Sequence, residues 1–493
     1  MRPIIEEVPW NHGPQGLGAR LARLPGTVVL ESARLLSHRA RYSLVTTDPF
    51  LTFRSTGTRC EVGSLEGSQT QYGNPWRLLD SLQARCELLD EIDFPFPLGG
   101  CFGFWGYDLK NFVEPRLTRK TLNDLELPDC SVGFHDSLVV FDHELHQAWL
   151  VSTGLRPDGS REESRALARR QQWLGWIASA GQAEGPGTPA EASKAPAPRP
   201  AEWRSTTSRA GFVEGVRRAQ ELIRAGDIYQ VNLSHRLTVD ARIDAWALYQ
   251  QLTAVSPAPF AAFLNAGDFA LCSSSPELFL RLSGAGILTR PIKGTRPRST
   301  DPTRDAQLSF ELQTSPKEMS ELVMITDLLR NDLGRVCEYG SVQVPELMQL
   351  ERYAQVQHLV STVEGRLRPG TTHLEAFASC FPGGSITGAP KIRAMEIIEE
   401  LEPVTRGPYT GAIGYLGFNR ESQLSILIRT AICQPERTHF QVGAGIVADS
   451  DPEAEYEETL AKAGGFLAAL GTRDLQAGDP LAVKGLKESP SSE

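Results

Sequence analysis

Two pairs of glutamates stand three residues apart in segments with a helical pattern. Glu318 and Glu321 lie in the segment 315–336, and Glu455 and Glu458 lie near the C-terminus. Side chains at this spacing share one face of a helix. Four converging carboxylates repel one another unless a cation offsets their charge, and magnesium prefers oxygen ligands. The pairs predict a Mg²⁺ site between two helices, although acidic first turns also occur because they suit the helix dipole.

A lysine and a further glutamate could carry covalent and acid catalysis. Lys293 stands in Pro-Ile-Lys-Gly-Thr, where a strand is expected to enter a turn. Flanking proline and glycine present such an amine rigidly, so it could be a nucleophile or an exposed turn residue. Glu277 ends an apolar strand in Ser-Ser-Ser-Pro-Glu. Its carboxyl group could cap a turn, or it could be an acid held near a substrate hydroxyl.

Two further segments suit an anionic substrate. The stretch Phe-Pro-Gly-Gly-Ser-Ile-Thr-Gly-Ala-Pro-Lys at 381–391 supplies backbone donors ahead of a helix, but it lacks the residue order of a phosphate-binding P-loop. Arg429 lies in the alternating segment 426–432, which reads as a strand. An inward-facing guanidinium there could bind a carboxylate with two hydrogen bonds, and an exposed arginine on an edge strand is the alternative.

The elements that must position these residues indicate an α+β fold with antiparallel strands. Short β-branched segments dominate region 1–179, which is therefore expected to be rich in β-sheet. Region 206–475 alternates strands with helical patterns, such as 208–224 and 317–330, and is expected to be catalytic. A Pro/Ala-rich linker or loop is expected at 180–205, and a flexible tail at 476–493.

Composition limits the possible partners and compartment. The chain has 493 residues, of which 41% are hydrophobic and 22% charged, as in soluble globular proteins. A net charge of -10 offers no basic field for nucleic acid. No apolar run is long enough to span a membrane, and no leader pattern opens the chain, so a cytoplasmic protein is expected. The eight cysteines are scattered, which favours reduced thiols.

Several blocks, taken in order along the chain, resemble the chorismate-utilising enzymes. The resemblance is strong from about 226 to 465, and it rests on SSPELF, PIKGT, KEMSELVMITDLLRNDLGRV, VQHLVSTVEG, FPGGSITGAPK, YTGAIGYLGF and GAGIVADSDPEAEYEETLAKA. The family includes anthranilate, aminodeoxychorismate, isochorismate and salicylate synthases. It implies the chorismate-binding-enzyme fold, in which layered antiparallel β-sheets flanked by helices enclose a magnesium-dependent chorismate site.

The resemblance also implies roles for individual residues. Glu321 and Glu458 would bind Mg²⁺, with Glu318 and Glu455 beside it, and His358 matches an active-site histidine of the family. Leu322 departs from the family, because many relatives have histidine there. The residues implied in substrate binding are Gly294, Thr295, Thr387, Tyr409, Arg429, Gly443, Ala444, Gly445 and Lys462.

Two positions bear on which reaction the resemblance implies. Aminodeoxychorismate synthases have lysine where Lys293 stands, whereas anthranilate synthases have alanine. Gln230 stands where enzymes that add water to chorismate carry lysine, and glutamine is no general base at neutral pH. The implied reaction is amination of chorismate at C4 through a covalent Lys293 intermediate, with Glu277 as the acid, on the route to 4-aminobenzoate and folate. The alternatives are anthranilate formation, isochorismate or salicylate formation, and an inactive ligand-binding regulatory subunit.

The implied partners are an ammonia source and, as a further ligand, tryptophan. No cysteine lies in the Gly-x-Cys-x-Gly pattern of a glutaminase nucleophile, so ammonia is expected from a separate glutamine amidotransferase subunit. A segment around 31–43, together with 257–263, resembles the part of the family that holds tryptophan. The candidate tryptophan-binding residues are Ser32, Tyr42, Ser43 and Phe263.

Overall fold

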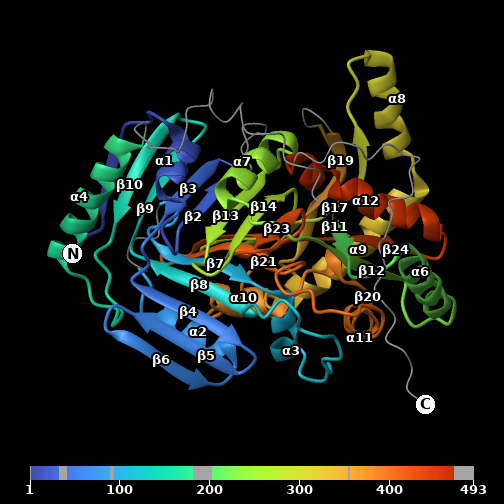
Figure 1. Cartoon of the computed structure of the whole chain (residues 1–493), viewed down its shortest axis with the longest axis horizontal. Helices are drawn as coiled ribbons and strands as arrows, with labels where there is room; N and C mark the ends of the chain where they lie inside the picture. Colours follow the sequence, from blue (N-terminus) through green and yellow to red (C-terminus); the bar gives the residue numbers. More distant parts are fainter. Residues whose placement is uncertain (1, 33–40, 89–93, 181–202, 353–355, 471–493) are drawn as a thin grey trace.

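Two large antiparallel sheets form the centre of the molecule, as the α+β expectation requires. The computed structural model describes residues 2–32, 41–88, 94–180, 203–352 and 356–470. Within these residues each sheet contains 12 strands, and every pairing between named strands is antiparallel. Helices flank both sheets (Figure 1). The predicted chorismate-binding-enzyme architecture is therefore confirmed at the level of sheets and helices.

The first sheet combines strands from both ends of the sequence. Its strands, in spatial order, are β1 (Ile4–Val8), β10 (Gln147–Ser152), β9 (Ser137–Asp142), β3 (Tyr42–Thr46), β2 (Val28–Glu31), β13 (Phe260–Asn265), β14 (Ala270–Ser275), β23 (Thr430–Cys433), β24 (Thr438–Ile446), β12 (Gln230–Val239) and β11 (Trp203–Ser205), and β20 (Gly388–Ala389) also pairs with β12.

The second sheet is built in the same way. Its strands, in spatial order, are β17 (Ile292–Pro297), β19 (Val356–Arg366), β16 (Gly286–Arg290), β15 (Leu278–Ser283), β22 (Glu421–Ile426), β21 (Ala412–Gly417), β7 (Gly100–Trp105), β8 (Cys130–His135), β4 (Leu51–Thr56), β5 (Arg59–Ser64) and β6 (Gly67–Tyr72), and β18 (Gln343–Arg352) also pairs with β19.

The helices lie around the sheets, with α1 and α4 at one end of the molecule and α6, α11 and α12 at the other (Figure 1). Their bounds are α1 (Gly13–Leu21), α2 (Pro75–Ala84), α3 (Lys110–Val113), α4 (Glu163–Ser179), α6 (Arg209–Arg224), α7 (Ala245–Val255), α8 (Pro302–Gln313), α9 (Pro316–Gly334), α10 (His373–Cys380), α11 (Lys391–Leu401) and α12 (Pro452–Ala469). The predicted helices at 208–224 and 317–330 correspond to α6 and α9.

Alternation along the strands explains why both faces of the first sheet are covered. In β9, Leu138 and Val140 belong to the large core between the sheets. Val139 and Phe141 belong to a second core under the outer helices. Successive side chains of a strand point to opposite faces, so a continuous apolar strand must be buried on both sides.

The two predicted regions meet along one seam in each sheet. In the first sheet β2 pairs with β13, with Glu31 opposite Ala261. In the second sheet β7 pairs with β21, with Trp105 opposite Ala412. Most of the predicted linker and the predicted tail lie outside the described residues. The last three linker residues form β11 and pair with β12, so the expectation of a loop is wrong for Trp203–Ser205.

All eight cysteines are free and buried, as predicted. Among the described residues, no helix combines the length and the apolar character needed to cross a membrane.

Candidate active site

Lys293 lies in a β-bulge rather than in the predicted turn. The pairing of β17 with β19 shifts register between Lys293 and Thr295, and Gly294 between them has φ +68°. A bulge inserts one residue into a strand and redirects the neighbouring side chains. The Lys293 side chain is largely buried, and its Nζ lies 3.8 Å from Oε2 of Glu321 on α9. The bulge therefore presents the amine to the acidic helix.

Glu277 follows β14 and is held inside the protein. Its backbone carbonyl accepts a hydrogen bond from the N–H of Ile426, and the residue is only 7% exposed. Burial raises the pKa of Glu277, although a hydrogen bond with Ser385 and the charge of Lys293 act in the opposite direction. Desolvation favours the neutral carboxylic acid. Glu277 is therefore suited to donate a proton.

Lys293 and Glu277 both line one cavity of about 580 Å³. The cavity lies between the end of β14, the middle of β24, the bulge in β17, and the helices α9 and α12. Sequence-predicted residues on its wall are Glu277, Lys293, Gly294, Thr295, Glu318, Glu321, His358, Tyr409, Arg429, Gly443, Gly445, Glu455, Glu458 and Lys462. Residues far apart in the sequence thus converge on a single site.

The four predicted metal-binding glutamates lie on α9 and α12 and face the same cavity. Ser315 caps α9 and accepts a hydrogen bond from the N–H of Glu318, and Asp451 caps α12. Each carboxylate has a nearby cation. The pairs are Glu318 with Arg296 at 3.4 Å, Glu321 with Lys293 at 3.8 Å, Glu455 with Lys317 at 3.7 Å, and Glu458 with Lys462 at 2.7 Å.

These carboxylates do not form a compact ligand cluster. Within the described ranges, no three His, Cys, Asp or Glu side chains are grouped closely enough to hold an ion. Burial raises the pKa of Glu321 and of Glu455. Burial acts on Glu458 in the same direction, but the charge and hydrogen bond of Lys462 bring its pKa below the ordinary value. The carboxylate oxygens are nevertheless the donors that a hard divalent ion prefers.

Arg429 is placed differently from its prediction. It does not lie within a strand, because β22 ends at Ile426 and β23 begins at Thr430. Its φ of +51° belongs to the left-handed region. The chain passes here from the second sheet to the first, so the continuous apolar alternation of the sequence spans two different strands. The correct placement is a junction between sheets.

The guanidinium of Arg429 faces the cavity without an anionic partner. No salt bridge joins it to a carboxylate of the described residues, and burial lowers its pKa. A partly desolvated guanidinium gains most from an ion pair with bidentate hydrogen bonds. Arg429 is therefore the strongest candidate to bind a carboxylate of a ligand.

His358 and Tyr409 complete the wall around the bulge. Nδ1 of His358 lies 2.9 Å from Oγ1 of Thr295 and 3.4 Å from the carbonyl of Gly294. Burial lowers the pKa of His358 to about 4, with a contribution from Arg429, so the ring is neutral at pH 7. A neutral imidazole can position a neighbour by hydrogen bonding but supplies no imidazolium acid. Burial also raises the pKa of Tyr409.

Two predicted substrate-binding residues do not line the cavity. Ala444 packs in a hydrophobic core behind β24, because Gly443 and Gly445 occupy the alternate positions that face the cavity. Thr387 is fully buried, and its hydroxyl donates to the carbonyls of Gly383 and Gly384. Lys462 does line the cavity. Its Nζ reaches the floor of the cavity, which Gly443 and Gly445 of β24 form, and donates a hydrogen bond to the carbonyl of Gly443 at 2.9 Å.

The predicted tryptophan residues are divided between different places. Ser32 and Tyr42 line a separate cavity of about 20 Å³, which has room for about one water molecule. Ser43 accepts a hydrogen bond from the N–H of Ser32 and supports that wall. Phe263 faces the other side of β13, where it packs against Trp246 at 5.0 Å. Tryptophan binding stays a prediction.

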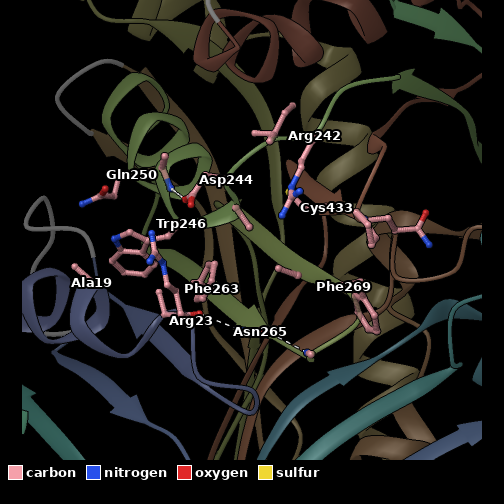
Figure 2. Close-up of a pocket in the computed structure, with 18 of the residues that line it drawn as sticks. Ala19, Arg23, Arg242, Asp244, Trp246, Gln250, Phe263, Asn265, Phe269 and Cys433 are labelled. Atoms are coloured by element: carbon pink, nitrogen blue, oxygen red, sulfur yellow. Dashed lines mark hydrogen bonds between the residues drawn. The ribbon is translucent and has the colours of Figure 1, made fainter. Parts of the chain in front are cut away.

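A larger cavity of about 1080 Å³ lies on the side of β13 that Phe263 faces (Figure 2). Phe263 and Trp246 lie side by side on its wall, and Arg242 lies across from them (Figure 2). None of the predicted catalytic or metal-binding residues lines it. The cavity of about 580 Å³ that contains Lys293 and Glu277 is therefore the candidate active site.

Several cavity residues were not singled out in the sequence. Ser385 hydrogen-bonds with Glu277, and Lys317 lies near Glu455. Asn232 and Gln441 contribute carboxamides to the wall. Ser385 and Lys317 belong to sequence blocks quoted for the family resemblance, but spacing alone could not show that their side chains reach the site.

Gly294→Ala is expected to destabilise the protein more than the same change at another left-handed glycine. An added Cβ would lie 2.6 Å from Cδ1 of Leu312 and 3.0 Å from Oε2 of Glu318. Gly226 has φ +84° but an added Cβ would have no neighbour within 4 Å. Gly226→Ala should cost about 1–2 kcal/mol of unfolding free energy. Gly294→Ala should cost about 1–3 kcal/mol more. Urea denaturation measures both, and equal losses would contradict the tight packing of the bulge.

The family model and the relatives that match this chain indicate the same family. The family model described as chorismate binding enzyme matches residues 34–468. Anthranilate synthase component 1 of Thermus thermophilus is 41% identical over 448 residues, covering 91% of this chain and 93% of that protein. Aminodeoxychorismate synthase component 1 of Bacillus subtilis is 37% identical over 444 residues, covering 90% and 91%. The crystal structure of anthranilate synthase component I from Streptococcus pneumoniae has a TM-score of 0.75 at 30% identity, covering 88% and 93%.

Proposed function

Because this chain belongs to the chorismate binding enzyme family, we propose that it replaces the C4 hydroxyl of chorismate with an amino group, forming 4-amino-4-deoxychorismate. Relatives named for two different aminations match it at 41% and 37% identity, so overall similarity does not choose between them. The observation that carries the proposal is the amine of Lys293, which enters the same cavity as the buried carboxyl group of Glu277.

In the proposed reaction Lys293 is the nucleophile. In its uncharged form the Lys293 amine forms a bond to C2 of chorismate, and the ring double bond shifts. The C4–O bond breaks while Glu277 gives its proton to the departing hydroxyl, which leaves as water. Ammonia then forms a bond to C4, the double bond shifts back, and the C2–N bond to Lys293 breaks. The bulge supports this assignment because it holds the amine in a fixed position within the cavity.

Chorismate carries two carboxylates, and the cavity offers groups that suit them. Arg429 has no anionic partner among the described side chains and is proposed to bind one carboxylate. The residues of the bulge, with His358 hydrogen-bonded to Thr295, would lie against the ring. Lys462 and the glycine floor of β24 are proposed to complete the binding site.

The acidic wall is proposed to bind Mg²⁺ through Glu321 and Glu458, with Glu318 and Glu455 beside them. The two helices bring four carboxylates to one cavity, which fits the oxygen ligands that magnesium prefers. When bound, the ion would supply positive charge that anchors and polarises a substrate carboxylate. Lys293 and Lys462 lie beside the two proposed metal ligands, at 3.8 Å from Glu321 and 2.7 Å from Glu458.

Ammonia is proposed to come from a glutamine amidotransferase partner. The Thermus thermophilus and Bacillus subtilis relatives are both named component 1, a name that implies a second component for those proteins. For this chain, the partner's identity rests on the absence of a glutaminase pattern from its own sequence. Tryptophan remains a second proposed ligand, and its binding would require the cavity of about 20 Å³ beside Ser32 and Tyr42 to widen.

The deciding experiment identifies the product. Purified protein is incubated with chorismate, MgCl₂ and ammonium chloride, and the product is measured by mass spectrometry. We expect a product that retains the enolpyruvyl group and has gained an amino group. Anthranilate, which has lost the enolpyruvyl group, would instead favour the second candidate function, for which the Thermus thermophilus relative is the specific observation. Absence of any turnover would favour a regulatory subunit.

A further inference from the structure

The larger cavity, of about 1080 Å³, is separate from the candidate active site (Figure 2). Among the described residues, none lines both cavities. The larger one lies between the C-terminal end of α1, the N-terminal end of α7, and the turns that join β13 to β14 and β23 to β24. Cavities of roughly 300–1,000 Å³ commonly hold small-molecule ligands, so this one has room for a ligand larger than a single ring.

Three arginine side chains on its wall have no acidic partner. Arg20 and Arg23 stand at the C-terminal end of α1, and Arg242 precedes α7. All three are exposed, and no salt bridge joins them to a carboxylate of the described residues. Arg20 contacts only the hydroxyl group of Ser179, at 3.4 Å. A guanidinium group can bind a phosphate or carboxylate with two parallel hydrogen bonds, so the wall offers three anion-binding groups.

The two carboxylates on the same wall are already engaged. Asp268 is paired with Arg54, with 3.1 Å between Oδ2 and Nη1. Asp244 caps α7 and accepts a hydrogen bond from the N–H of Ala247 at 2.8 Å. The three arginine charges are therefore not neutralised within the wall. The cavity is a locally positive region on a chain whose net charge is -10, and such a region attracts anions.

Trp246 adds a flat aromatic surface to the wall. Arg23 lies beside it in Figure 2, and Arg242 lies across the cavity. The indole packs edge-to-face on Phe263, with 5.0 Å between ring centroids and 89° between ring planes. Gly18 of α1 leaves room for the far edge of the indole, because a Cβ added there would lie 2.5 Å from Cη2. Trp246 is thus held in one orientation while it remains partly exposed.

We propose that this cavity binds a ligand in which a planar ring carries several negative charges, the chemistry of a nucleotide. Trp246 stacks on the ring, and the three arginines bind the phosphates. A chain of phosphates supplies enough charge for three guanidinium groups, whereas a single-ring carboxylate engages one and leaves most of the cavity unfilled. The site is independent of which reaction the candidate active site performs.

The test is isothermal titration calorimetry of the full-length chain with ATP. We expect one ATP to bind per chain. Adenosine and tripolyphosphate should each bind at least about tenfold more weakly than ATP, because each retains only the stacking or only the charge interactions. Benzoate represents an aromatic ring with a single carboxylate and should bind more weakly still.

Three variants separate the two kinds of contact. Arg23→Gln and Arg242→Gln should each lower the affinity for ATP and for tripolyphosphate about tenfold, since each removes charge-assisted hydrogen bonds. Trp246→Leu should lower the affinity for ATP about tenfold and leave that for tripolyphosphate unchanged. The two arginine side chains are exposed, so their replacement keeps the test decisive if Trp246→Leu does not fold.

Two controls locate the binding. Arg224→Gln removes an exposed arginine from the last turn of α6, at the other end of the molecule from α1 (Figure 1), and it too has no acidic partner among the described residues. Arg429→Gln alters the wall of the candidate active site. Both should bind ATP with the affinity of the wild type.

Absence of ATP binding to the wild type would overturn the proposal. So would unchanged ATP affinity in both Arg23→Gln and Arg242→Gln, or a loss of equal size in Arg224→Gln. A tenfold loss in Arg429→Gln alone would place the ATP in the candidate active site instead. Benzoate that binds as tightly as ATP would overturn the assigned ligand class in favour of an aromatic carboxylate.

Discussion

Lys293→Ala is expected to lower the rate of C4 amination by roughly a thousandfold, with some activity left from direct attack by ammonia. The variant removes the amine that the bulge in β17 holds in the cavity, 3.8 Å from Glu321. Steady-state rates with chorismate, MgCl₂ and ammonium chloride measure the loss. Lys293→Arg is the matched control, because it keeps the positive charge but is no nucleophile at neutral pH. Its rate should fall nearly as far.

A second measurement addresses the covalent bond directly. Wild-type protein incubated with chorismate but without ammonia should gain the mass of chorismate less one water, and Lys293→Ala should not. Wild-type turnover in Lys293→Ala would exclude covalent catalysis by this residue. Recovery of activity in Lys293→Arg would mean that the residue acts through its charge alone.

Glu277→Gln is expected to lower the maximal rate by about a hundredfold to ten-thousandfold, the range typical of a lost general acid. The side chain keeps its size and its place near Ser385 but can no longer give a proton to the departing hydroxyl. The KM for chorismate should change much less than the rate. Rates for wild type and variant at pH 7 measure both quantities.

The reaction rate is expected to depend on pH through the carboxyl group of Glu277. Burial raises the pKa of Glu277, so the protonated acid persists to higher pH than for an exposed glutamate. The wild-type rate should fall as pH rises through that pKa, because the proton donor is lost. In Glu277→Gln this decline should be absent. A decline of equal size in the variant would assign the titration to another group.

Parts of the site could be predicted because they depend on local sequence. The two glutamate pairs lie on helices whose capping residues, Ser315 and Asp451, are readable in the sequence. Their convergence on one cavity could not be derived from spacing, since it depends on how two helices far apart in the chain pack together. The resemblance to a known family supplied that information.

Other parts failed for identifiable physical reasons. Arg429 reads as a strand residue, because local alternation is the same whether one strand continues or two strands meet. The left-handed backbone there appears only when the chain changes sheets. Ala444 and Phe263 show a second limit, because one residue of register in a strand moves a side chain to the other face. Asn232 shows a third, since an unpaired buried oxygen is a property of its surroundings.

The seams between the two regions bear on how the protein is made. One edge of β2 is paired only when β13 is present, with Glu31 opposite Ala261. One edge of β7 is paired only when β21 is present, with Trp105 opposite Ala412. Contacts between residues so distant in sequence form late, and unpaired edges invite aggregation. A nascent chain that has emerged from the ribosome only as far as β10 would therefore expose the open edges of β2 and β7. Chaperone binding at that stage of synthesis would protect the yield of folded protein.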